Sequence, residues 1–406
     1  MVSREQSRQT ILILATLSVT YFVENFLRSS VSSLSPILIK ELGITLGEMG
    51  LLITAFYLIY GIMQPAAGLL SSMLGPRKTI LSFMILTCAG SVLFWLSHRY
   101  ELLFLAQFIM GVGQSVFYIN AVAIVSNWWP PEKKATAIGV LSASSGIGGF
   151  LCYMGFPLAQ TYLGDWRLLY LVVVLILFLN LGTNFLLVRD SPPDVAPTAT
   201  TRPKIVESLK DVLANKPFRV IIVVYTLTIF SGILNSWINP YLMNVKGLTY
   251  VEAGFVSSFG TVAGFLGCIV IGIVSDRLRS RRKPVVFFTG MASVLFACMI
   301  FIPAQMPFPA YALVWCGLCL CNSIWVLFWS MGGEMLPTGK SSIGLGMMNG
   351  ISTIISSIIA PIYGSLVDVT GSYFTPNIIA LGFSLATFAF IFFSVKETYK
   401  GVSAQH

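Results

Sequence analysis

The sequence predicts an all-α membrane protein with twelve transmembrane helices, arranged as two pseudo-symmetric six-helix bundles. Its 406 residues are 56% hydrophobic and only 10% charged, with a mean hydropathy of +0.82, and this composition is typical of polytopic membrane proteins. Long apolar runs recur along the chain, and one polar segment divides them six and six. The two halves also share a motif at a constant offset, which indicates an internal duplication.

Twelve runs approach or exceed the roughly 20 apolar residues that are needed to cross the hydrocarbon core of a bilayer. The first run is too long for a cleavable signal peptide and lacks a small-residue cleavage site, so we expect it to serve as its own insertion signal. The domains expected from this pattern are a bundle at 1–188, a linker at 189–218 and a bundle at 219–406. The runs lie at approximately 11–39, 46–73, 79–97, 101–127, 135–162, 166–188, 219–244, 251–275, 284–302, 308–335, 342–368 and 375–395.

The linker at 189–218 is rich in Pro and charge. Its first half is typical of a flexible connection. In its second half Ile205, Leu209, Val212 and Leu213 recur at helical spacing, which predicts a short amphipathic helix on the membrane surface.

Basic residues are distributed unevenly between the two sets of loops. The net charge is +9, and most Lys and Arg fall in the loops on the side that holds both termini. The opposite loops hold only Lys40, Arg99, Arg167 and Lys246. Since an excess of Lys and Arg marks the cytoplasmic side, we expect both termini in the cytoplasm. The charge therefore reflects topology, no nucleic-acid partner is expected, and a bacterial inner membrane or cell membrane is the expected location.

The two halves carry one signature 204 residues apart. "GITLGEMG" (43–50) and "GLTYVEAG" (247–254) share G-x-T-x-x-E-x-G. A constant offset through two motifs predicts that the halves are repeats. At the same offset the aligned pairs are Gly68 with Gly272, Ser72 with Asp276, Arg77 with Arg281, and Lys78 with Arg282.

The T-x-x-E part of this signature predicts a local role at the start of spans 2 and 8. Thr45 and Thr249 can accept hydrogen bonds from the first free N–H groups of a helix, with Glu48 and Glu252 reaching back. We therefore expect a capping box at each position rather than a substrate contact.

A loop motif follows span 8. "GIVSDRLRSRRK" (272–283) resembles the G-x-x-x-D-R-x-G-R-R motif of the major facilitator superfamily, with Arg279 at the central Gly position. "GLLSSMLGPRK" (68–78) is similar to a degraded copy, with Ser72 at the Asp position. In this superfamily the motif latches the two domains on the cytoplasmic side. The resemblance implies that the second copy, with Asp276 and Arg277, carries the latch. The implied gate residues are Gly68, Arg77, Gly272, Asp276, Arg277 and Arg281.

The resemblance extends over nearly the whole chain. "NWWPPEKKATAIGVLSASSGIGG" (127–149) and "DWRLLYLV" (165–172) look most like the anion:cation symporter family and the related organophosphate:phosphate antiporters. This resemblance implies two six-helix bundles around a central cavity, with alternating access by rocking of the halves. It implies no cofactor, and a single chain can work as a monomer in the lipid bilayer.

Two motifs have some residues in common with a phosphate-binding loop and with a metal-binding cluster, but each is interpreted as structural. "GIGGF" (146–150) has no following Lys-Ser/Thr and no preceding strand, so it is interpreted as a helix-packing face. "CGLCLC" (316–321) has no nearby His or carboxylate to complete a four-ligand set, so we expect structural thiols and no metal site. Because no nucleophile, base and orienting residue converge, the sequence predicts no catalytic site and no enzyme.

One face of span 1 is polar. Facing lipid, each charge would cost at least ~2.5 kcal/mol, so this face is expected to line the bundle interior or a wet cavity. In the anion:cation symporters an Arg of this kind on span 1 binds the substrate anion, usually with an Asp immediately before it. Here Leu27 precedes Arg28, and the acid is four residues earlier at Glu24, where it can meet Arg28 along the same face. The face comprises Tyr21, Glu24, Asn25, Arg28, Ser32 and Ser35.

Three interpretations of Glu24 and Arg28 stay open. In the first, Glu24 is the proton site, because a substrate anion that takes Arg28 leaves Glu24 unpaired and favours its protonation. In the second, the two charges clamp a zwitterion, with Arg28 on the carboxylate and Glu24 on the amine. In the third, they form a static ion pair that lets both charges tolerate burial.

Neutral polar residues on other spans complete the expected cavity. The resembled phosphate-ester antiporters have a second Arg on span 7, and this sequence has none in 220–242 of that span, so a monocarboxylate or zwitterion is favoured over a dianionic phosphate. The residues expected to line the cavity are Tyr57, Tyr60 and Gln64 on span 2, Gln114 and Tyr118 on span 4, Asn235 and Asn239 on span 7, Trp325 and Trp329 on span 10, and Asn349 and Thr353 on span 11.

The function expected from these observations is secondary active transport of a small organic anion, coupled to protons, by alternating access. One alternative is transport of zwitterionic amino acids or short peptides. Another alternative is an exporter of lipophilic compounds or a receptor that does not transport. The charges within span 1 argue against an exporter, whose cavity is expected to be hydrophobic.

Overall fold

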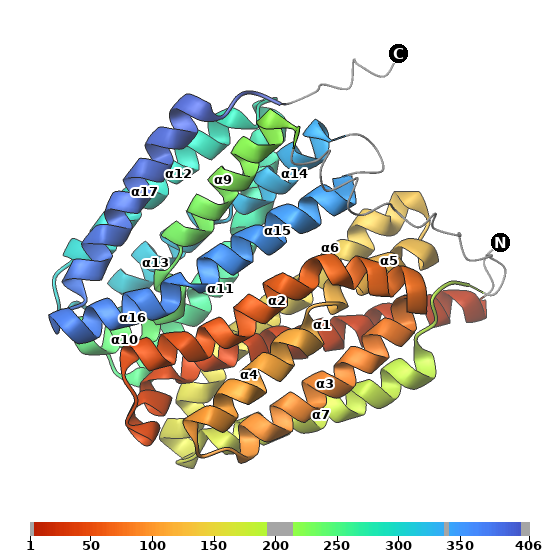
Figure 1. The fold of residues 1–406 in the computed structure, drawn as a ribbon, viewed down its shortest axis with the longest axis horizontal. Coiled ribbons are helices and arrows are strands. Elements are labelled where there is room, and N and C mark those ends of the chain that lie inside the picture. The colour runs from red at the N-terminus through yellow and green to blue at the C-terminus, as the bar shows by residue number, and fades with distance from the viewer. Residues whose placement is uncertain (1–3, 193–213, 337–340, 399–406) are drawn as a thin grey trace. The chain divides into compact units, whose positions relative to one another are not determined.

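The computed structural model describes residues 4–192, 214–336 and 341–398, and every regular element in these ranges is a helix (Figure 1). Within them, 12 stretches of helix are long and apolar enough to cross a membrane. The prediction of an all-α protein with twelve spans is therefore confirmed. The amphipathic helix expected at 205–213 lies outside the described residues.

The chain divides into two compact units. The first comprises Met1–Leu34 and Ala55–Pro203, and the second comprises Ser35–Thr54 and Lys204–His406. The segment Ser35–Thr54, which holds the end of span 1 and the start of span 2, therefore belongs by its contacts to the second unit. The sequence had placed the whole of 1–188 in one bundle, and that division stays a prediction.

The early helices supply the first unit. In it α3 packs against both α4 and α7 (Figure 1). The helices are α1 (Arg4–Leu42), α2 (Leu46–Leu74), α3 (Pro76–Leu96), α4 (Tyr100–Gln114), α5 (Phe117–Trp128), α6 (Pro131–Leu158) with the π-helical turn η1 (Ala159–Leu163), and α7 (Trp166–Leu187).

The later helices supply the second unit. In it α11 lies along α13, α12 contacts both α13 and α17, and α9 contacts α15 and α17. The helices are α9 (Lys216–Ser231), α10 (Leu234–Lys246), α11 (Tyr250–Arg277), α12 (Arg282–Phe301), α13 (Phe308–Asn322), α14 (Trp325–Met335), α15 (Ser341–Ser357), α16 (Ile359–Thr370) and α17 (Phe374–Ser394).

Four spans are broken into two helices each, namely spans 4, 7, 10 and 11. In span 11 the cause is Pro361, which has no N–H to donate to the carbonyl of Ser357. The hydroxyl of Thr54 donates to that carbonyl instead, over 2.6 Å. In span 4 the carbonyl of Ser115, at the break, accepts from Nε2 of Gln64 over 3.3 Å. Polar side chains thus satisfy the backbone groups that breaks would otherwise expose to lipid.

The predicted capping boxes are confirmed at both positions. Thr249 Oγ1 accepts from the N–H of Glu252, and the N–H of Thr249 donates to the Glu252 carboxylate over 2.9 Å. The N–H of Thr45 donates to Glu48 over 2.8 Å, and the N–H of Glu48 donates back to Thr45 Oγ1.

A second carboxylate reaches the start of α2 from α16. Asp368 accepts from the N–H of Leu46 over 3.1 Å and from the N–H of Gly47 over 2.8 Å. The two helices approach closely, because a Cβ placed on Gly364 would lie 2.2 Å from the carbonyl oxygen of Leu46. These contacts explain why the start of α2 clusters with the second unit.

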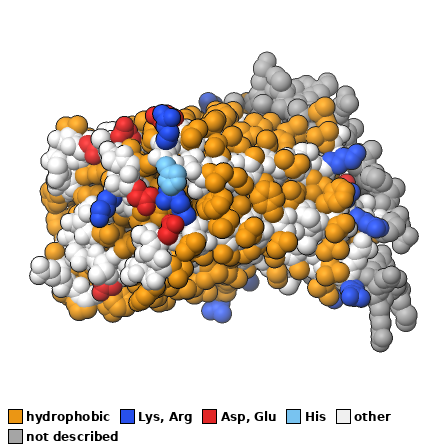
Figure 2. Space-filling view, turned by 90° about the horizontal axis from the view of Figure 1, so that it is seen from below, with side chains coloured by type: hydrophobic (Ala, Val, Ile, Leu, Met, Phe, Trp, Pro, Cys, Tyr) orange, Lys and Arg blue, Asp and Glu red, His pale blue; other side chains and the backbone are white. Residues whose placement is uncertain are grey.

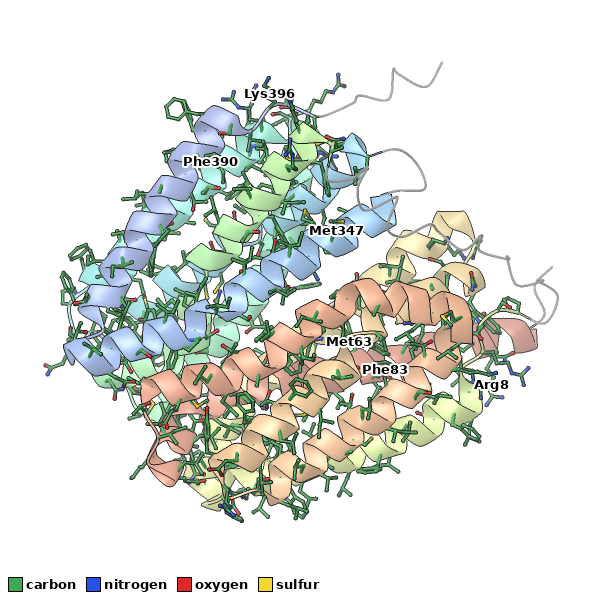
Figure 3. The ribbon with its side chains drawn as sticks, viewed as in Figure 1. Arg8, Met63, Phe83, Met347, Phe390 and Lys396 are labelled. Carbon is green, nitrogen blue, oxygen red and sulfur yellow. The ribbon has the colours of Figure 1, made fainter. Side chains whose placement is uncertain are left out.

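Hydrophobic side chains cover the middle of the face seen in Figure 2, and charged side chains gather toward its two ends. This pattern is that of a surface whose middle lies in lipid. Arg8 lies near the N-terminal end of α1, and Lys396 lies just beyond α17 (Figure 3).

Candidate functional site

The charged face of span 1 lies in the first unit, around Arg28. Nη2 of Arg28 donates to Oδ1 of Asn25, and Nδ2 of Asn25 donates in turn to the carbonyl of Tyr21 over 2.9 Å. The guanidinium carbon lies 5.8 Å from the ring centre of Tyr60 on α2, which is within range of a cation–π interaction. The half-buried guanidinium is therefore held by an amide and an aromatic ring, both of them neutral.

Glu24 and Arg28 interact electrostatically, but the hydrogen bond of the guanidinium goes to Asn25. Glu24 is 4% exposed, and its Oε1 has no hydrogen-bond partner. Asn25, adjacent in sequence and three residues from Arg28 on the same face, accepts the hydrogen bond of the guanidinium instead. Arg28 and Glu24 therefore still interact electrostatically, while the guanidinium is hydrogen-bonded to a neutral amide and Oε1 of Glu24 accepts no hydrogen bond.

Aromatic rings surround this face of α1. The ring of Tyr21 stacks on Phe117, with centroids 5.8 Å apart, and on Tyr118, with centroids 5.1 Å apart. The hydroxyl of Tyr118 lies 3.3 Å from Oγ of Ser142. On α2, the half-buried Tyr57 lies next to Tyr60 one turn away. The structure therefore places Tyr60 beside Arg28 and Tyr118 against Tyr21, and their role in substrate binding stays a prediction.

A buried polar network holds α1 against α7. Thr20 donates to Oδ1 of Asn180 over 2.6 Å and accepts from Nδ2 of Asn184 over 2.9 Å. All three side chains are at most 4% exposed. Because interhelical hydrogen bonds stabilise helix packing in lipid, this network fixes the position of the helix that carries Arg28.

Two predicted glutamines lie at the break in span 4. Gln64 is buried and donates to the carbonyl of Ser115, so its amide nitrogen is engaged in structure. Gln114 is 3% exposed, and neither Oε1 nor Nε2 has a hydrogen-bond partner.

In the second unit, three polar side chains from different spans form a chain of hydrogen bonds. Nε1 of Trp329 on α14 donates to the hydroxyl of Tyr225 on α9, and that hydroxyl donates to Oδ1 of Asn349 on α15, each over 3.3 Å. Trp329 and Asn349 were predicted from the sequence. Tyr225 was not predicted from the sequence.

Other predicted residues of the second unit are placed separately. Asn239 is fully buried and accepts from Oγ of Ser257 over 2.5 Å, so it joins α10 to α11. Asn235 is exposed, and its Oδ1 accepts from the thiol of Cys319 over 3.9 Å. Trp325 is 44% exposed. Roles of these three in substrate binding stay predictions.

The loop motif after α11 forms a charged network within the second unit. Nη1 of Arg281 pairs with Oδ1 of Asp276 over 2.7 Å, and Nε pairs with Oε1 of Glu334 on α14 over 3.2 Å. Burial by itself would lower the pKa of Arg281, but the hydrogen bonds and charges of Asp276 and Glu334 outweigh it and raise the pKa above its ordinary value. The arginine that engages Asp276 is thus Arg281, whereas the side chain of Arg277 is exposed in the last turn of α11.

Arg77 and Arg281, which are aligned by the repeat, make equivalent backbone hydrogen bonds in their own units. The N–H of Arg77 donates to Oδ1 of Asp190, which follows α7, over 2.6 Å. The N–H of Arg281 donates to Oε1 of Glu397, which follows α17, over 2.8 Å. In each unit, a carboxylate that follows the last helix therefore accepts a hydrogen bond at the N-terminal end of the helix of the third span, α3 or α12. The helix dipole favours negative charge at that end. The predicted gate positions Gly68 and Gly272 lie in α2 and α11.

Glycines of span 5 confirm the packing interpretation of "GIGGF". A Cβ on Gly148 would lie 2.3 Å from the carbonyl oxygen of Phe22, so α6 and α1 are in backbone contact there. Among the described residues no group of three or more His, Cys, Asp or Glu could hold a metal ion, and the three cysteines of "CGLCLC" have free thiols.

Comparison with known proteins identifies the family. The model of the Major Facilitator Superfamily matches residues 17–361. A probable sulfoacetate transporter of Cupriavidus necator is 24% identical over 91% of this chain and 90% of its own length. The hexuronate transporter of Bacillus subtilis is 23% identical over 90% of each chain.

The fold also matches a solved structure. A bacterial homologue of the human lysosomal transporter Spinster, in an inward-facing and unoccupied conformation, superimposes with a TM-score of 0.79 over 95% of this chain and 97% of that one, at 16% identity. With twelve spans, this protein is a multi-pass integral membrane protein and a transporter rather than an enzyme. The chain belongs to the major facilitator superfamily.

Proposed function

We propose that this transporter moves a small organic anion bearing a carboxylate together with a proton, by alternating access. The observation that carries the proposal is the guanidinium of Arg28, held at membrane depth by Asn25 and the Tyr60 ring rather than by an acid. A buried cation without a hydrogen-bonded carboxylate favours binding of an anion, because the bound anion would neutralise it and form charge-assisted hydrogen bonds.

The relatives support the same class of substrate. Sulfoacetate and hexuronate, which give two of them their names, both carry a carboxylate. The arginine of span 7, Arg219, is exposed in the first turn of α9, and none lies further along at 220–242, so a substrate with one carboxylate facing Arg28 fits this chain better than a phosphate ester.

We assign the proton to Glu24. Its buried Oε1 has no partner, and a carboxylate in such surroundings is more stable when it is protonated. An anion that enters beside Glu24 would raise the cost of its negative charge further, so binding of the anion and of the proton would favour each other. Both termini are assigned to the cytoplasm, from the distribution of Lys and Arg.

The direct test is uptake by purified protein in liposomes, with sulfoacetate and glucuronate as probes and an imposed pH gradient. We expect Arg28→Ala to abolish uptake and binding. Arg28→Lys should retain weak binding, because lysine keeps the positive charge but lacks the planar set of N–H donors that binds a carboxylate through two hydrogen bonds. Arg99→Ala is the matched control, since that side chain is 77% exposed. Normal uptake by folded Arg28→Ala protein would refute the proposal.

A zwitterionic substrate is the second candidate, because Oε1 of Glu24, which accepts no hydrogen bond, could also receive an amine. The panel should therefore include amino acids and dipeptides with free and with acetylated amines. Binding that is lost on acetylation, and lost in Glu24→Gln, would favour the zwitterion over the carboxylate with a proton.

A further inference from the structure

Spans 1 and 4 are in register around Tyr21. Its ring stacks on Phe117 and Tyr118 at the start of α5, with both interplanar angles at 27°. Because successive spans cross the membrane in alternating directions, spans 1 and 4 run antiparallel. One turn forward from Tyr21 along α1 is Glu24, and one turn back from Phe117 is Gln114. Helical rise therefore places the two residues at one level of the neighbouring helices, and the spacing of three residues keeps each near the face that carries the stacked rings.

Both of these side chains are buried and carry polar atoms without a hydrogen-bond partner. Glu24 is 4% exposed and Gln114 is 3% exposed. Oε1 of Glu24 has no hydrogen-bond partner, and neither do Oε1 and Nε2 of Gln114. Buried polar atoms are nearly always paired, and leaving them unpaired is costly. Two such side chains with unused hydrogen-bonding capacity indicate a pair that forms in another step of the cycle.

Glu24 has other charged and polar neighbours, but none of them is hydrogen-bonded to its Oε1. On its own helix, Arg28 and Tyr21 interact electrostatically with it, and on α2 Tyr60 does so. Arg28 donates to Asn25, and Tyr118 of span 4 is hydrogen-bonded to Ser142. Gln114, the last residue of α4, is the neutral polar residue of span 4 that helical geometry places at the level of Glu24.

We propose that Gln114 positions Glu24 in its proton-loaded state. A proton from water on the side to which the site is open binds the Glu24 carboxylate, and the new O–H donates to Oε1 of Gln114. When that proton leaves to water on the other side, Nε2 of Gln114 can donate to the carboxylate instead. A carboxamide serves both states by turning, because it carries an acceptor and a donor on one carbon. This inference rests on the proposed proton role of Glu24.

The test compares pH-driven uptake with exchange in the absence of a pH gradient, using the carboxylate probe that the native protein transports. Gln114→Leu should lose pH-driven uptake by roughly tenfold, the effect of removing a hydrogen bond to a charged group, while exchange is reduced less. Gln114→Asn keeps the amide but is one methylene shorter. Its pH-driven uptake should lie between that of the native protein and that of Gln114→Leu. Gln107→Leu is the matched control: Gln107 is buried in α4 with an unpartnered Nε2, two turns away, and its loss should leave the pH profile unchanged.

A double-mutant cycle decides whether the two residues act together. In a Glu24→Gln background, Gln114→Leu should cause no further loss. Independent, additive losses would overturn the inference, and so would an unchanged pH profile in Gln114→Asn or Gln114→Leu. If Glu24→Gln itself keeps the native pH dependence, the proton role of Glu24 fails as well; if only the Gln114 variants keep it, the proposed function stands and this inference alone is wrong.

Discussion

Arg281 and Glu334 form an ion pair of 3.2 Å between Nε and Oε1, and the same guanidinium reaches Asp276. The side chain of Arg281 is 15% exposed and that of Glu334 is 22% exposed, so solvent screens the pair only in part. The hydroxyl of Thr398 also donates to Glu334, over 3.0 Å. One arginine therefore ties the end of α11 to α14.

Removing this arginine should destabilise the second unit. We expect Arg281→Gln to lower the free energy of unfolding by about 2 kcal/mol, because Glu334 keeps its charge and loses its cation. Thermal unfolding of the purified protein in detergent measures the effect. Arg277→Gln is the control, since that side chain is exposed and should cost little. If Arg277→Gln proved the more damaging change, the latch would be centred on Arg277, as the loop motif alone implied.

Replacing Arg279 by glycine should stabilise the protein. Arg279 has a φ of 48°, and this left-handed conformation costs a side-chain-bearing residue about 1 kcal/mol. It follows the last turn of α11, where the N–H of Ser280 closes the helix by donating to the carbonyl of Ser275, a position that commonly holds glycine. Arg279→Gly should therefore raise the unfolding midpoint, and Gln305→Gly, at a φ of 65°, should do the same. A lower midpoint for Arg279→Gly would mean that its side chain contributes more than its backbone costs.

Adding a methyl group at Gly148 should disrupt the contact between α6 and α1. The new Cβ would lie 2.3 Å from the carbonyl oxygen of Phe22, and overpacking of this kind typically costs about 1–3 kcal/mol. On the same helix, Gly139 has nothing within 4 Å of an added Cβ. Gly139→Ala should therefore be neutral or stabilising in the same unfolding experiment. Equal effects of the two changes would show that α6 is not in close contact at Gly148.

A disulfide between α2 and α16 should stop transport. A Cβ on Gly47 would lie 3.5 Å from Cα of Ser365, which is close enough for cysteines at both positions to be bridged. Alternating access requires movement of the halves, and we expect the contact of α2 with α16 to open in each cycle. Oxidised Gly47→Cys/Ser365→Cys protein, with the seven native cysteines replaced, should be inactive and regain uptake on reduction. Each single-cysteine variant is a control. Unchanged uptake by fully cross-linked protein would show that this contact stays closed.

Uptake should increase as the external pH falls, and Glu24 should be responsible. A proton that binds Glu24 from outside would be carried inward with the substrate. A lower external pH therefore increases the fraction of transporter molecules that hold this proton. Glu24→Gln mimics the protonated state permanently, and it should exchange substrate while being insensitive to the pH gradient. Glu101→Gln, at a side chain that is 75% exposed, should behave like the native protein. A Glu24→Gln variant that still accumulates substrate against its gradient would move the proton site elsewhere.

Local features of the fold could be predicted because their causes are local. A span needs only a sufficiently long apolar run, and a capping box needs only Thr and Glu three residues apart, so Thr45 and Thr249 were identified correctly. Close helix packing at Gly148 was predicted for the same reason. The partner of Arg28 was not predictable in this way, since both Glu24 and Asn25 share its helical face and the choice depends on side-chain geometry.

Contacts between distant segments could not be deduced from the pattern. Neither Asp190 nor Glu397 has a distinctive sequence context, yet each binds the start of a helix more than a hundred residues away in sequence. Tyr225 was missed because one tyrosine in an apolar span does not reveal which other spans it faces.

The sequence by itself determined the twelve spans, the duplication and the presence of a charged pair of residues at membrane depth, because hydropathy and helical periodicity depend on residue type and order alone. Only the tertiary structure decided which groups those charges meet: Arg28 is held by Asn25 and Tyr60, Oε1 of Glu24 is buried without a hydrogen-bond partner, and Arg281 rather than Arg277 joins Asp276. The physical reason is that hydrogen bonds and ion pairs act over about 3 Å, so their partners are set by how helices from distant parts of the chain pack.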